Sequence, residues 1–310
     1  MPALELVLVV NPEAGAGRAR RLLPRLLRDL EANGAAVELR LTEARGHATE
    51  LVRNALVGGA PGVAVVGGDG TLNEAVNGFF DEKGVPLEPG AWLAPMPCGT
   101  GGDFRRTLGL PTDVSAMAAR VVHGKLTPLD VGWMSFLGPD GRPAARAFLN
   151  IASFGLGGEV DRVVNEGPKW LGGRLTFLLG TLRAMAGYRN RAVRLRIDDG
   201  EPWEGRILNV AIANGRYFGG GMHIAPRAQL DDGLFDVVAI EREGAWANLA
   251  LAPQLYRGTL LDRPGVFFAR GRTVIAEPTE EAPVLLDVDG EAPGQLPATF
   301  EMRAGALTLR

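Results

Sequence analysis

The chain has 310 residues and a formal net charge of −3, and 46% of its residues are hydrophobic against 22% charged. These values are typical of a loop-rich globular protein large enough for two domains, and they give no sign of a general affinity for nucleic acid. The single cysteine, Cys98, excludes an internal disulfide and a cysteine-built zinc site. The N-terminal residues lack the pattern of a signal peptide, and no apolar run is long enough to span a membrane. We therefore expect a cytoplasmic protein.

The first 125 residues alternate between apolar strand-like runs and amphipathic helical segments. Strands are predicted at 4–10, 36–42, 63–66 and 91–94, and helices at 18–33, 46–57, 71–80 and 113–123. Thr71 is predicted to cap the helix over 71–80. Such alternation indicates βαβ units on a parallel sheet, so the predicted fold class is α/β, with an N-terminal domain over residues 1–127.

After residue 126 strand-like runs dominate, and Asp-Gly turn signals separate them. Strands are predicted at 129–134, 147–152, 193–197, 207–213, 234–240, 266–269, 273–276 and 284–288, with one helix at 171–188 and a strand-like tail at 298–309. This pattern predicts an antiparallel β-sandwich domain over residues 128–297.

Three glycine-rich segments follow strands of the predicted parallel sheet. They are NPEAGAG (11–17), GGDGTLNE (67–74) and PCGTGGDF (97–104). Loops that follow parallel strands gather at one edge of the sheet, where α/β proteins bind phosphate. Asp69 at such an edge is well placed to hold Mg²⁺, although a tight turn capped by Asp69 explains the same residues. Asp103 fits a helix cap and a site residue about equally.

The three segments do not contain a conventional P-loop with its phosphate-binding lysine. The motif G-x-x-x-x-G-K-[ST] is absent, and lysine occurs only at Lys83, Lys125 and Lys169. Any bound phosphate must therefore be met by main-chain N–H groups, a metal ion or arginine. Glu291 follows a D-G turn in DVDGE, and from the residues alone it reads either as a solvent-exposed hairpin residue or as a carboxylate that projects into a site.

Taken in order, these motifs resemble the diacylglycerol-kinase catalytic family, in which bacterial soluble lipid kinases have sphingosine and ceramide kinases as relatives. NPEAGAG resembles the family's N-P-x-x-G-x-G, and GGDGTLNEAVNG is similar to its most specific signature. PCGTGGDF is similar to P-x-G-T-x-N-D-F, with Gly102 where the family usually has Asn. The motifs LDVG, FLNIASFGLGGEV, GGGMHIAPRAQLDDGLFDVV and DVDGE follow in the expected order.

The resemblance implies an ATP-binding α/β domain similar to that of NAD kinase and phosphofructokinase, and a β-rich domain that holds the acceptor lipid. The lipid hydroxyl is expected to enter between the two domains, and the tail, 298–310, is expected to return to the first domain. It implies phosphoryl transfer from Mg·ATP to a lipid hydroxyl, diacylglycerol being the first expectation, with Glu291 as general base and Asp69 holding the metal at the transferring phosphate. A further Mg²⁺ is implied at Asp232 with the backbone carbonyls of Gln229 and Leu234. Nucleotide contacts are implied at Asn11, Gly15, Thr42, Gly68, Asp69, Gly70, Thr71, Glu74 and Thr100.

Two other functions remain open from the sequence. An NAD kinase shares the GGDGT motif, and a non-catalytic lipid-binding protein could keep the kinase frame. The expected partner is a lipid at a membrane surface, reached by transient association, and a homodimer stays open. His223 is a possible lining residue of the acceptor site, and apolar residues between 170 and 185 are a possible lip for acyl chains.

Overall fold

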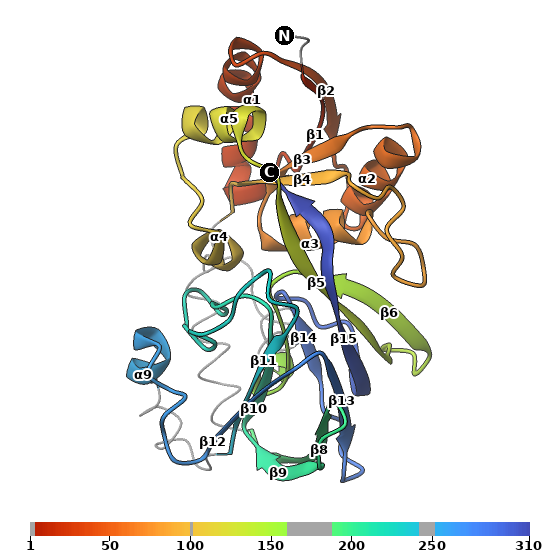
Figure 1. Cartoon of the computed structure of the whole chain (residues 1–310), viewed down its shortest axis with the longest axis vertical. Coiled ribbons are helices and arrows are strands. Elements are labelled where there is room, and N and C mark those ends of the chain that lie inside the picture. Colours follow the sequence, from red (N-terminus) through yellow and green to blue (C-terminus); the bar gives the residue numbers. More distant parts are fainter. Residues whose placement is uncertain (1–3, 100–101, 160–187, 242–251) are drawn as a thin grey trace. The chain divides into compact units, whose positions relative to one another are not determined.

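The computed structural model of the chain describes residues 4–99, 102–159, 188–241 and 252–310 (Figure 1). The chain divides into two compact units. The first contains the residues up to Val131, Leu230–Asp232 and Arg303–Arg310, and the second contains Gly132–Gln229 and Gly233–Met302. Thr100, the helix predicted over 171–188 up to its last residue, and the apolar residues between 170 and 185 lie outside the described residues.

The first unit is built on a parallel sheet with the strand order β2-β1-β3-β4. These strands are β1 (Leu4–Val10), β2 (Ala35–Leu41), β3 (Gly62–Gly67) and β4 (Trp92–Pro97). The last residues of β15 (Gln295–Leu309) extend this sheet, because Thr308 and Leu309 pair in parallel with Trp92 and Leu93 of β4. Because these four strands run parallel, the loops that follow them lie at the same edge of the sheet.

Helices cover both faces of this sheet. They are α1 (Ala14–Ala32), α2 (His47–Val57), α3 (Asp69–Asn77), α4 (Asp103–Leu108) and α5 (Val114–His123). Leu6, Leu8 and Val10 pack in one core with side chains of α1 and α5. Since successive strand side chains point to opposite faces, buried Val7 and Val9 lie on the other face. The predicted α/β fold of this domain, with a parallel sheet, is confirmed.

The end of strand β4 differs from the prediction. Strand β4 continues through Pro95 and Pro97, whereas the sequence predicted its end at residue 94. Cys98 N–H donates to the Gly67 carbonyl, so the alternate positions 95 and 97 direct their nitrogens to the other side. There, the pairing with β15 stops at Leu93, and a proline without an N–H therefore costs no ladder hydrogen bond.

The second unit contains antiparallel strands arranged in two groups (Figure 1). The first part of β15 pairs with β13, β13 with β8, and β8 with β9, while β5 pairs with β6. The other sheet has the order β12-β11-β10-β7-β14. The strand bounds are β5 Thr127–Leu137, β6 Pro143–Phe148, β7 Ile151–Gly155, β8 Arg191–Ile197, β9 Trp203–Ile207, β10 Asn209–Ala213, β11 Phe235–Ile240, β12 Val266–Gly271, β13 Thr273–Pro278 and β14 Leu286–Val288, and a short helix, α9, spans Ala252–Arg257.

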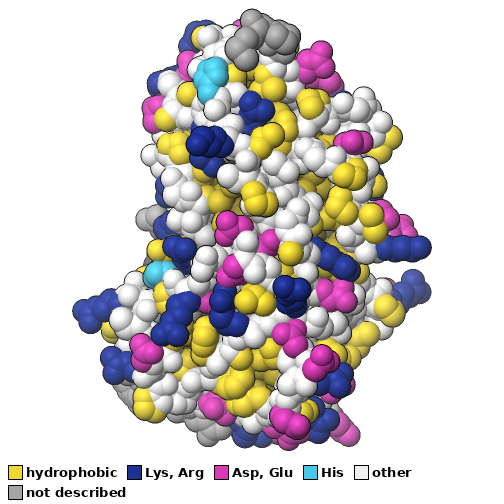
Figure 2. Space-filling view, viewed as in Figure 1, with side chains coloured by type: hydrophobic (Ala, Val, Ile, Leu, Met, Phe, Trp, Pro, Cys, Tyr) yellow, Lys and Arg dark blue, Asp and Glu magenta, His cyan; other side chains and the backbone are white. Residues whose placement is uncertain are grey.

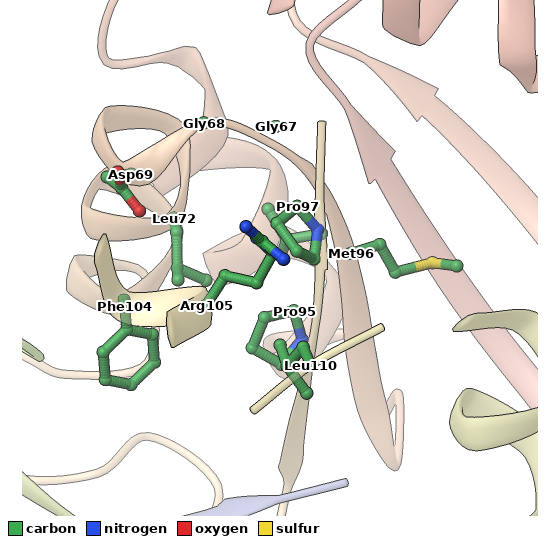
Figure 3. A pocket seen from close by; sticks show the side chains of 11 residues that line it. Gly67, Gly68, Asp69, Leu72, Pro95, Met96, Pro97, Phe104, Arg105 and Leu110 are labelled. Carbon is green, nitrogen blue, oxygen red and sulfur yellow. The ribbon is translucent and has the colours of Figure 1, made fainter. Parts of the chain in front are cut away.

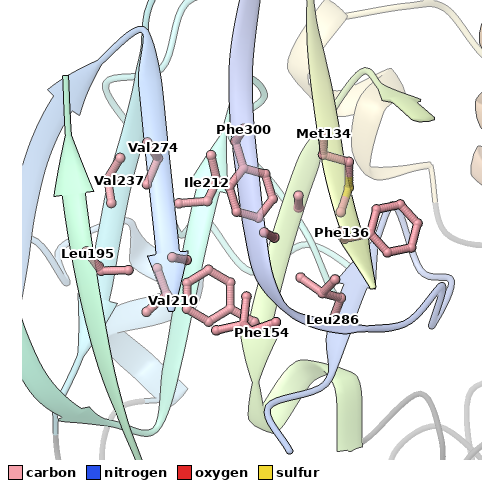
Figure 4. Packing of buried hydrophobic residues seen from close by; sticks show 14 of the residues in the cluster. Met134, Phe136, Phe154, Leu195, Val210, Ile212, Val237, Val274, Leu286 and Phe300 are labelled. Atoms are coloured by element: carbon pink, nitrogen blue, oxygen red, sulfur yellow. The ribbon is translucent and has the colours of Figure 1, made fainter. Parts of the chain in front are cut away.

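One apolar core holds these sheets together. Phe300 of β15, Phe154 of β7 and Val210 of β10 pack in it, as Figure 4 shows. Phe148 stacks on Phe235 with ring centroids 5.7 Å apart, and Phe300 meets Phe148 edge-on. Side chains from both sheets therefore interdigitate, as in a β-sandwich. The predicted antiparallel second domain is confirmed.

The strand predicted over 147–152 is instead two strands, β6 and β7, with a break at Leu149–Asn150. The backbone N–H groups of Leu149, Asn150 and Ile151 donate to the side-chain carboxylate of Asp289 rather than to a neighbouring strand. The apolar run hid this break, because its cause lies about 140 residues further along the chain.

In the part of the chain that the structure describes, no helix is long and apolar enough to cross a membrane. The face shown in Figure 2 carries acidic and basic side chains interspersed with apolar ones, in keeping with the small net charge.

Candidate functional site

The three glycine-rich segments meet at the carboxyl ends of β1, β3 and β4. The Asn11 side-chain amide donates a 3.0 Å hydrogen bond to Thr71 Oγ1, which joins the first segment to the second. A Cβ on Gly99 would lie 2.7 Å from the Cα of Gly68, so the second and third segments touch through their backbones. The predicted convergence of the three segments is therefore present in the first unit.

The first segment turns through three consecutive left-handed residues, Gly15, Ala16 and Gly17, inside the helix-like start of α1. Gly15 has a φ of +62°, and a Cβ there would lie only 2.2 Å from the Cys98 carbonyl oxygen. Gly17 has a φ of +75° but open space around its would-be Cβ. Gly15 is thus required both by conformation and by the close approach of the third segment.

Asp69 lies at the first position of α3 and faces the third segment. Its Oδ2 accepts hydrogen bonds from the N–H of Gly102 at 2.8 Å and of Asp103 at 3.3 Å. Burial raises the pKa of Asp69, the nearby Asp103 carboxylate raises it further, and the backbone N–H donors oppose both effects. The carboxylate is therefore held in place by main-chain donors while its own negative charge is poorly compensated.

Helix α3 begins two residues earlier than predicted, so Thr71 does not cap it. The capping position is Gly68, in an extended conformation, and the Gly68 carbonyl accepts the Leu72 N–H. A Cβ on Gly67 would lie 2.5 Å from Thr71 Cβ, so Gly67 lets α3 start directly at the strand end. Gly70 differs, because no atom of the described residues lies within 4 Å of its would-be Cβ, and those residues give no packing reason for glycine there.

The remaining predicted nucleotide residues of this unit are found as follows. Thr42 follows β2, and its N–H donates to the Val10 carbonyl at 2.9 Å. Glu74 lies in α3, where its carbonyl accepts a hydrogen bond from Thr49 Oγ1. Thr100 lies outside the described residues. At Gly102, where the resembled family usually has Asn, the main-chain N–H makes the contact to Asp69, while Asp103 pairs with Arg106 at 2.6 Å.

A cavity in this unit is lined by Gly67, Gly68 and Asp69 on one side and by Pro95, Pro97 and Leu72 nearby (Figure 3). Arg105 of α4 also lines it. Sequence reasoning missed Arg105, since a basic residue in a short helix resembles many surface arginines. The signal available was the scarcity of lysine, which leaves arginine as the cationic side chain for a phosphate.

In the second unit, Glu291 closes a two-residue hairpin turn. Val288 and Glu291 exchange both backbone hydrogen bonds, at 2.8 and 3.0 Å, around Asp289 and Gly290. Both turn residues have positive φ, +51° and +86°, as the D-G sequence of a type I′ turn requires. The Gly290 N–H also donates to Asp287 Oδ1.

The turn is fixed by Asp289 rather than by Glu291. The Asp289 carboxylate accepts the N–H groups of Leu149, Asn150 and Ile151 at 2.9–3.2 Å. Its own N–H donates to the Ile151 carbonyl. These bonds anchor the backbone that carries Glu291.

The Glu291 carboxylate forms an ion pair with Arg146 of β6, with Oε2 and Nη2 2.9 Å apart. Both side chains are largely buried, with exposed fractions of 15% and 18%. Glu291 is therefore not the freely solvated hairpin residue that the sequence left open. Sequence reasoning missed Arg146, because 145 residues separate the two partners.

The predicted second metal segment, 229–234, is a turn that contains Gly233 with a φ of +73°. The Leu230 carbonyl accepts the Asp130 N–H at 2.7 Å, and Asp130 Oδ1 accepts the Gly305 N–H. Within the described ranges, no group of three or more His, Cys, Asp or Glu side chains has the arrangement of a metal site. A site of one carboxylate, Asp232, with carbonyls of Gln229 and Leu234 has the oxygen chemistry that Mg²⁺ prefers, so it stays a proposal.

His223 stacks on Tyr217 with ring centroids 4.3 Å apart, and burial together with Arg216 lowers the pKa of His223. A Cβ on Gly258 would touch His223 Nδ1 at 2.5 Å. His223 Nε2 is buried and has no hydrogen-bond partner among the described residues, so its role in lining the acceptor site stays a prediction.

Two family models match the chain. The diacylglycerol kinase catalytic domain matches residues 5–134, and the YegS C-terminal NAD kinase beta sandwich-like domain matches residues 150–310. A diacylglycerol kinase of Staphylococcus carnosus is 31% identical over 297 residues, which cover 94% of this chain and 90% of that protein. This chain belongs to the diacylglycerol kinase family. The family resemblance of its motifs is thereby confirmed.

A second curated relative and two solved structures are also similar to this chain. A diacylglycerol kinase of Bacillus subtilis is 27% identical over 94% of this chain and 91% of its own. The crystal structure of a candidate diacylglycerol kinase from Bacillus anthracis superimposes with a TM-score of 0.76 at 28% identity, covering 99% of this chain and 96% of that one. Yeast NADH kinase, at 12% identity and a TM-score of 0.54 over 100% of this chain and 83% of its own, shares the fold.

The polar groups at the glycine segments of the first unit are suited to the nucleotide that a kinase binds. Membership of this family implies ATP as the phosphoryl donor. The residues that face the glycine segments offer carboxylate and hydroxyl oxygens and main-chain N–H groups, which are the groups that bind Mg²⁺ and phosphate.

Proposed function

We propose that this chain is a lipid kinase that transfers the terminal phosphoryl group of ATP to the hydroxyl of diacylglycerol, giving phosphatidic acid. The observation that carries the proposal is the mutual contact of the three glycine segments, through Asn11 and Thr71, Gly15 and Cys98, and Gly68 and Gly99. Relatives named diacylglycerol kinase that cover nearly the whole chain support the choice of lipid.

The nucleotide is assigned to residues 1–127 with the tail 298–310. Gly68 and Gly70 let the backbone approach the phosphates, and the open space over Gly70 is consistent with this role. Asn11 holds Thr71 through its amide, so the hydroxyl stays at a fixed position beside the phosphates. Gly15, Thr42, Glu74 and Thr100 are assigned to further nucleotide contacts.

Asp69 is assigned to the metal that accompanies ATP. Bound Mg²⁺ would neutralise charge on the phosphate oxygens during transfer. The Gly102 and Asp103 N–H groups fix one carboxylate oxygen of Asp69. The raised pKa of Asp69 reflects a buried carboxylate that gains stability when a cation binds beside it. Gln229, Asp232 and Leu234 are assigned to a second, structural Mg²⁺.

Glu291 is assigned as the general base that accepts the proton of the lipid hydroxyl. Asp289 fixes the turn that carries it, and the ion pair with Arg146 orients its carboxylate. Phosphoryl transfer needs little covalent chemistry from the protein beyond such a positioned carboxylate and charge neutralisation. The acceptor lipid is assigned to residues 128–297, with the enzyme meeting it by transient association with a membrane surface.

The test is a labelled-ATP assay of the purified chain with a panel of acceptors. The panel holds diacylglycerol, phosphatidylglycerol, a sphingoid base, a polyprenol and NAD, and the product is identified by its mass. We expect labelled phosphatidic acid from diacylglycerol, and loss of transfer in Glu291→Gln and Asp69→Ala with the fold retained. Labelled NADP as the main product, or lipid binding without any ATP turnover, would overturn the proposal.

A further inference from the structure

Among the described residues that line the cavity beside the second and third glycine segments, Arg105 is the cationic one. Arg105 lines it together with Gly67, Gly68 and Asp69. Figure 3 shows its guanidinium extending from α4 past Leu72 toward Pro97, below the Gly67–Gly68 backbone. A positive charge is therefore placed next to the segment that carries the most specific motif of the chain.

The charge of Arg105 is not balanced by another described residue. Its neighbour Arg106 forms an ion pair with Asp103, whereas Arg105 makes no hydrogen bond or ion pair with any side chain or carbonyl among the described residues. Apart from Asp69 and Arg105, the cavity is lined by glycine, proline, leucine, valine, methionine and phenylalanine. A partly buried guanidinium in such surroundings has lost water without gaining a counter-charge, so an anion bound there would be stabilised.

Gly102 lies directly against the Arg105 side chain. A Cβ on Gly102 would lie 3.2 Å from Arg105 Nε, closer than an ordinary van der Waals contact. Gly102 also has a φ of +70°, and its N–H donates to Asp69. The same residue therefore holds the carboxylate assigned to the metal and leaves room for the guanidinium.

We propose that Arg105 binds the terminal phosphates of the nucleotide and supplies the positive charge that a lysine supplies in a P-loop. This inference rests on the proposed function of the site. The planar guanidinium can donate two parallel hydrogen bonds to phosphate oxygens, and such charge-assisted pairs are among the strongest that proteins form. A phosphate carried by an anionic lipid headgroup has the same chemistry, and the experiment separates the two sources.

The test measures the affinity of the purified full chain for Mg·ATP, Mg·ADP and AMP by calorimetry. The variants are Arg105→Gln and Arg105→Lys, and the matched control is Arg28→Gln, which removes the same charge from an exposed position on α1. We expect Arg105→Gln to weaken Mg·ATP binding by about 10- to 100-fold, the range of a charged hydrogen bond. AMP affinity should change less than about twofold, because AMP lacks the terminal phosphates. The Mg·ATP affinity of Arg105→Lys should lie between those of Arg105→Gln and wild type, and Arg28→Gln should bind Mg·ATP as tightly as wild type.

The outcomes separate this inference from the function on which it rests. Wild-type affinity for Mg·ATP in Arg105→Gln overturns the role of Arg105 and leaves the kinase proposal standing. Failure of the wild-type chain to bind any nucleotide overturns the kinase proposal itself. In a parallel arm, the variants are sedimented with phosphatidylglycerol or phosphatidylcholine vesicles. Loss of phosphatidylglycerol binding with ATP affinity unchanged assigns Arg105 to a lipid headgroup and contradicts the inference.

Discussion

Gly15→Ala separates the two reasons for which glycine stands in the first segment. A side chain at a φ of +62° costs about 1–2 kcal/mol in the left-handed conformation. The added Cβ would also lie 2.2 Å from the Cys98 carbonyl oxygen, so one of the two segments must move. Overpacking of this kind costs a further 1–3 kcal/mol or so, which gives about 2–5 kcal/mol in total.

Gly17→Ala is the matched control for this change. Gly17 has a φ of +75° and no atom of the described part of the chain within 4 Å of its would-be Cβ, so only the conformational cost of about 1–2 kcal/mol applies. At about 2–4 °C per kcal/mol, Gly17→Ala should lower the melting temperature by about 2–8 °C, and Gly15→Ala by more. Only Gly15→Ala should also weaken Mg·ATP binding, because it displaces the third segment. Equal melting temperatures and equal ATP affinities in the two variants would refute the convergence of the segments as described.

Three further results are expected. Glu291→Gln should lower kcat by about 10²- to 10⁴-fold, the usual range for a general base, in an assay of labelled phosphatidic acid, and full activity would remove this role. Asp289→Asn places an amide nitrogen against backbone N–H donors, so it should cost about 1–3 kcal/mol in urea unfolding and lower kcat without changing the KM for ATP; an unchanged kcat would show that the anchoring does not matter for Glu291. The pKa of Asp69 is raised above 3.8, so the folded state holds the proton of Asp69 more tightly than the unfolded state does, and ionisation of Asp69 lowers the stability of the folded state. Asp69→Asn should therefore melt at a higher temperature than wild type at pH 7 without metal, and the difference should vanish as the pH falls toward 3.8. A lower melting temperature for Asp69→Asn at pH 7 would contradict that reasoning.

The parallel sheet was predictable because its signals are local. Apolar strands, amphipathic helices and glycine corners recur within about 30 residues, and their periodicity is sufficient for βαβ units. The boundaries that failed depend on partners elsewhere in the chain. Strand β4 runs through Pro95 and Pro97 because the neighbouring strand ends before them, and no local pattern reveals that.

The same distinction holds for the candidate site. The glycine segments were recognisable in the sequence as short motifs, and the topology of a parallel sheet predicted where they meet. The sequence did not predict the roles of Arg146 and Arg105, because the role of an arginine depends on which residues lie beside it in space. The ion pair of Arg146 with Glu291 joins residues far apart in sequence, and Arg105 matters because it lines the same cavity as Gly67, Gly68 and Asp69.

Amide hydrogen exchange of the full chain with and without Mg·ATP tests the central claim most directly, since the claim is that main-chain N–H groups of three segments hold the phosphates together. Peptides that cover Asn11–Gly17, Gly67–Thr71 and residues 97–105 should become protected at the same nucleotide concentration, with peptides over α2 unchanged. Protection of only one of these segments, or of none while ATP is bound, would contradict the account.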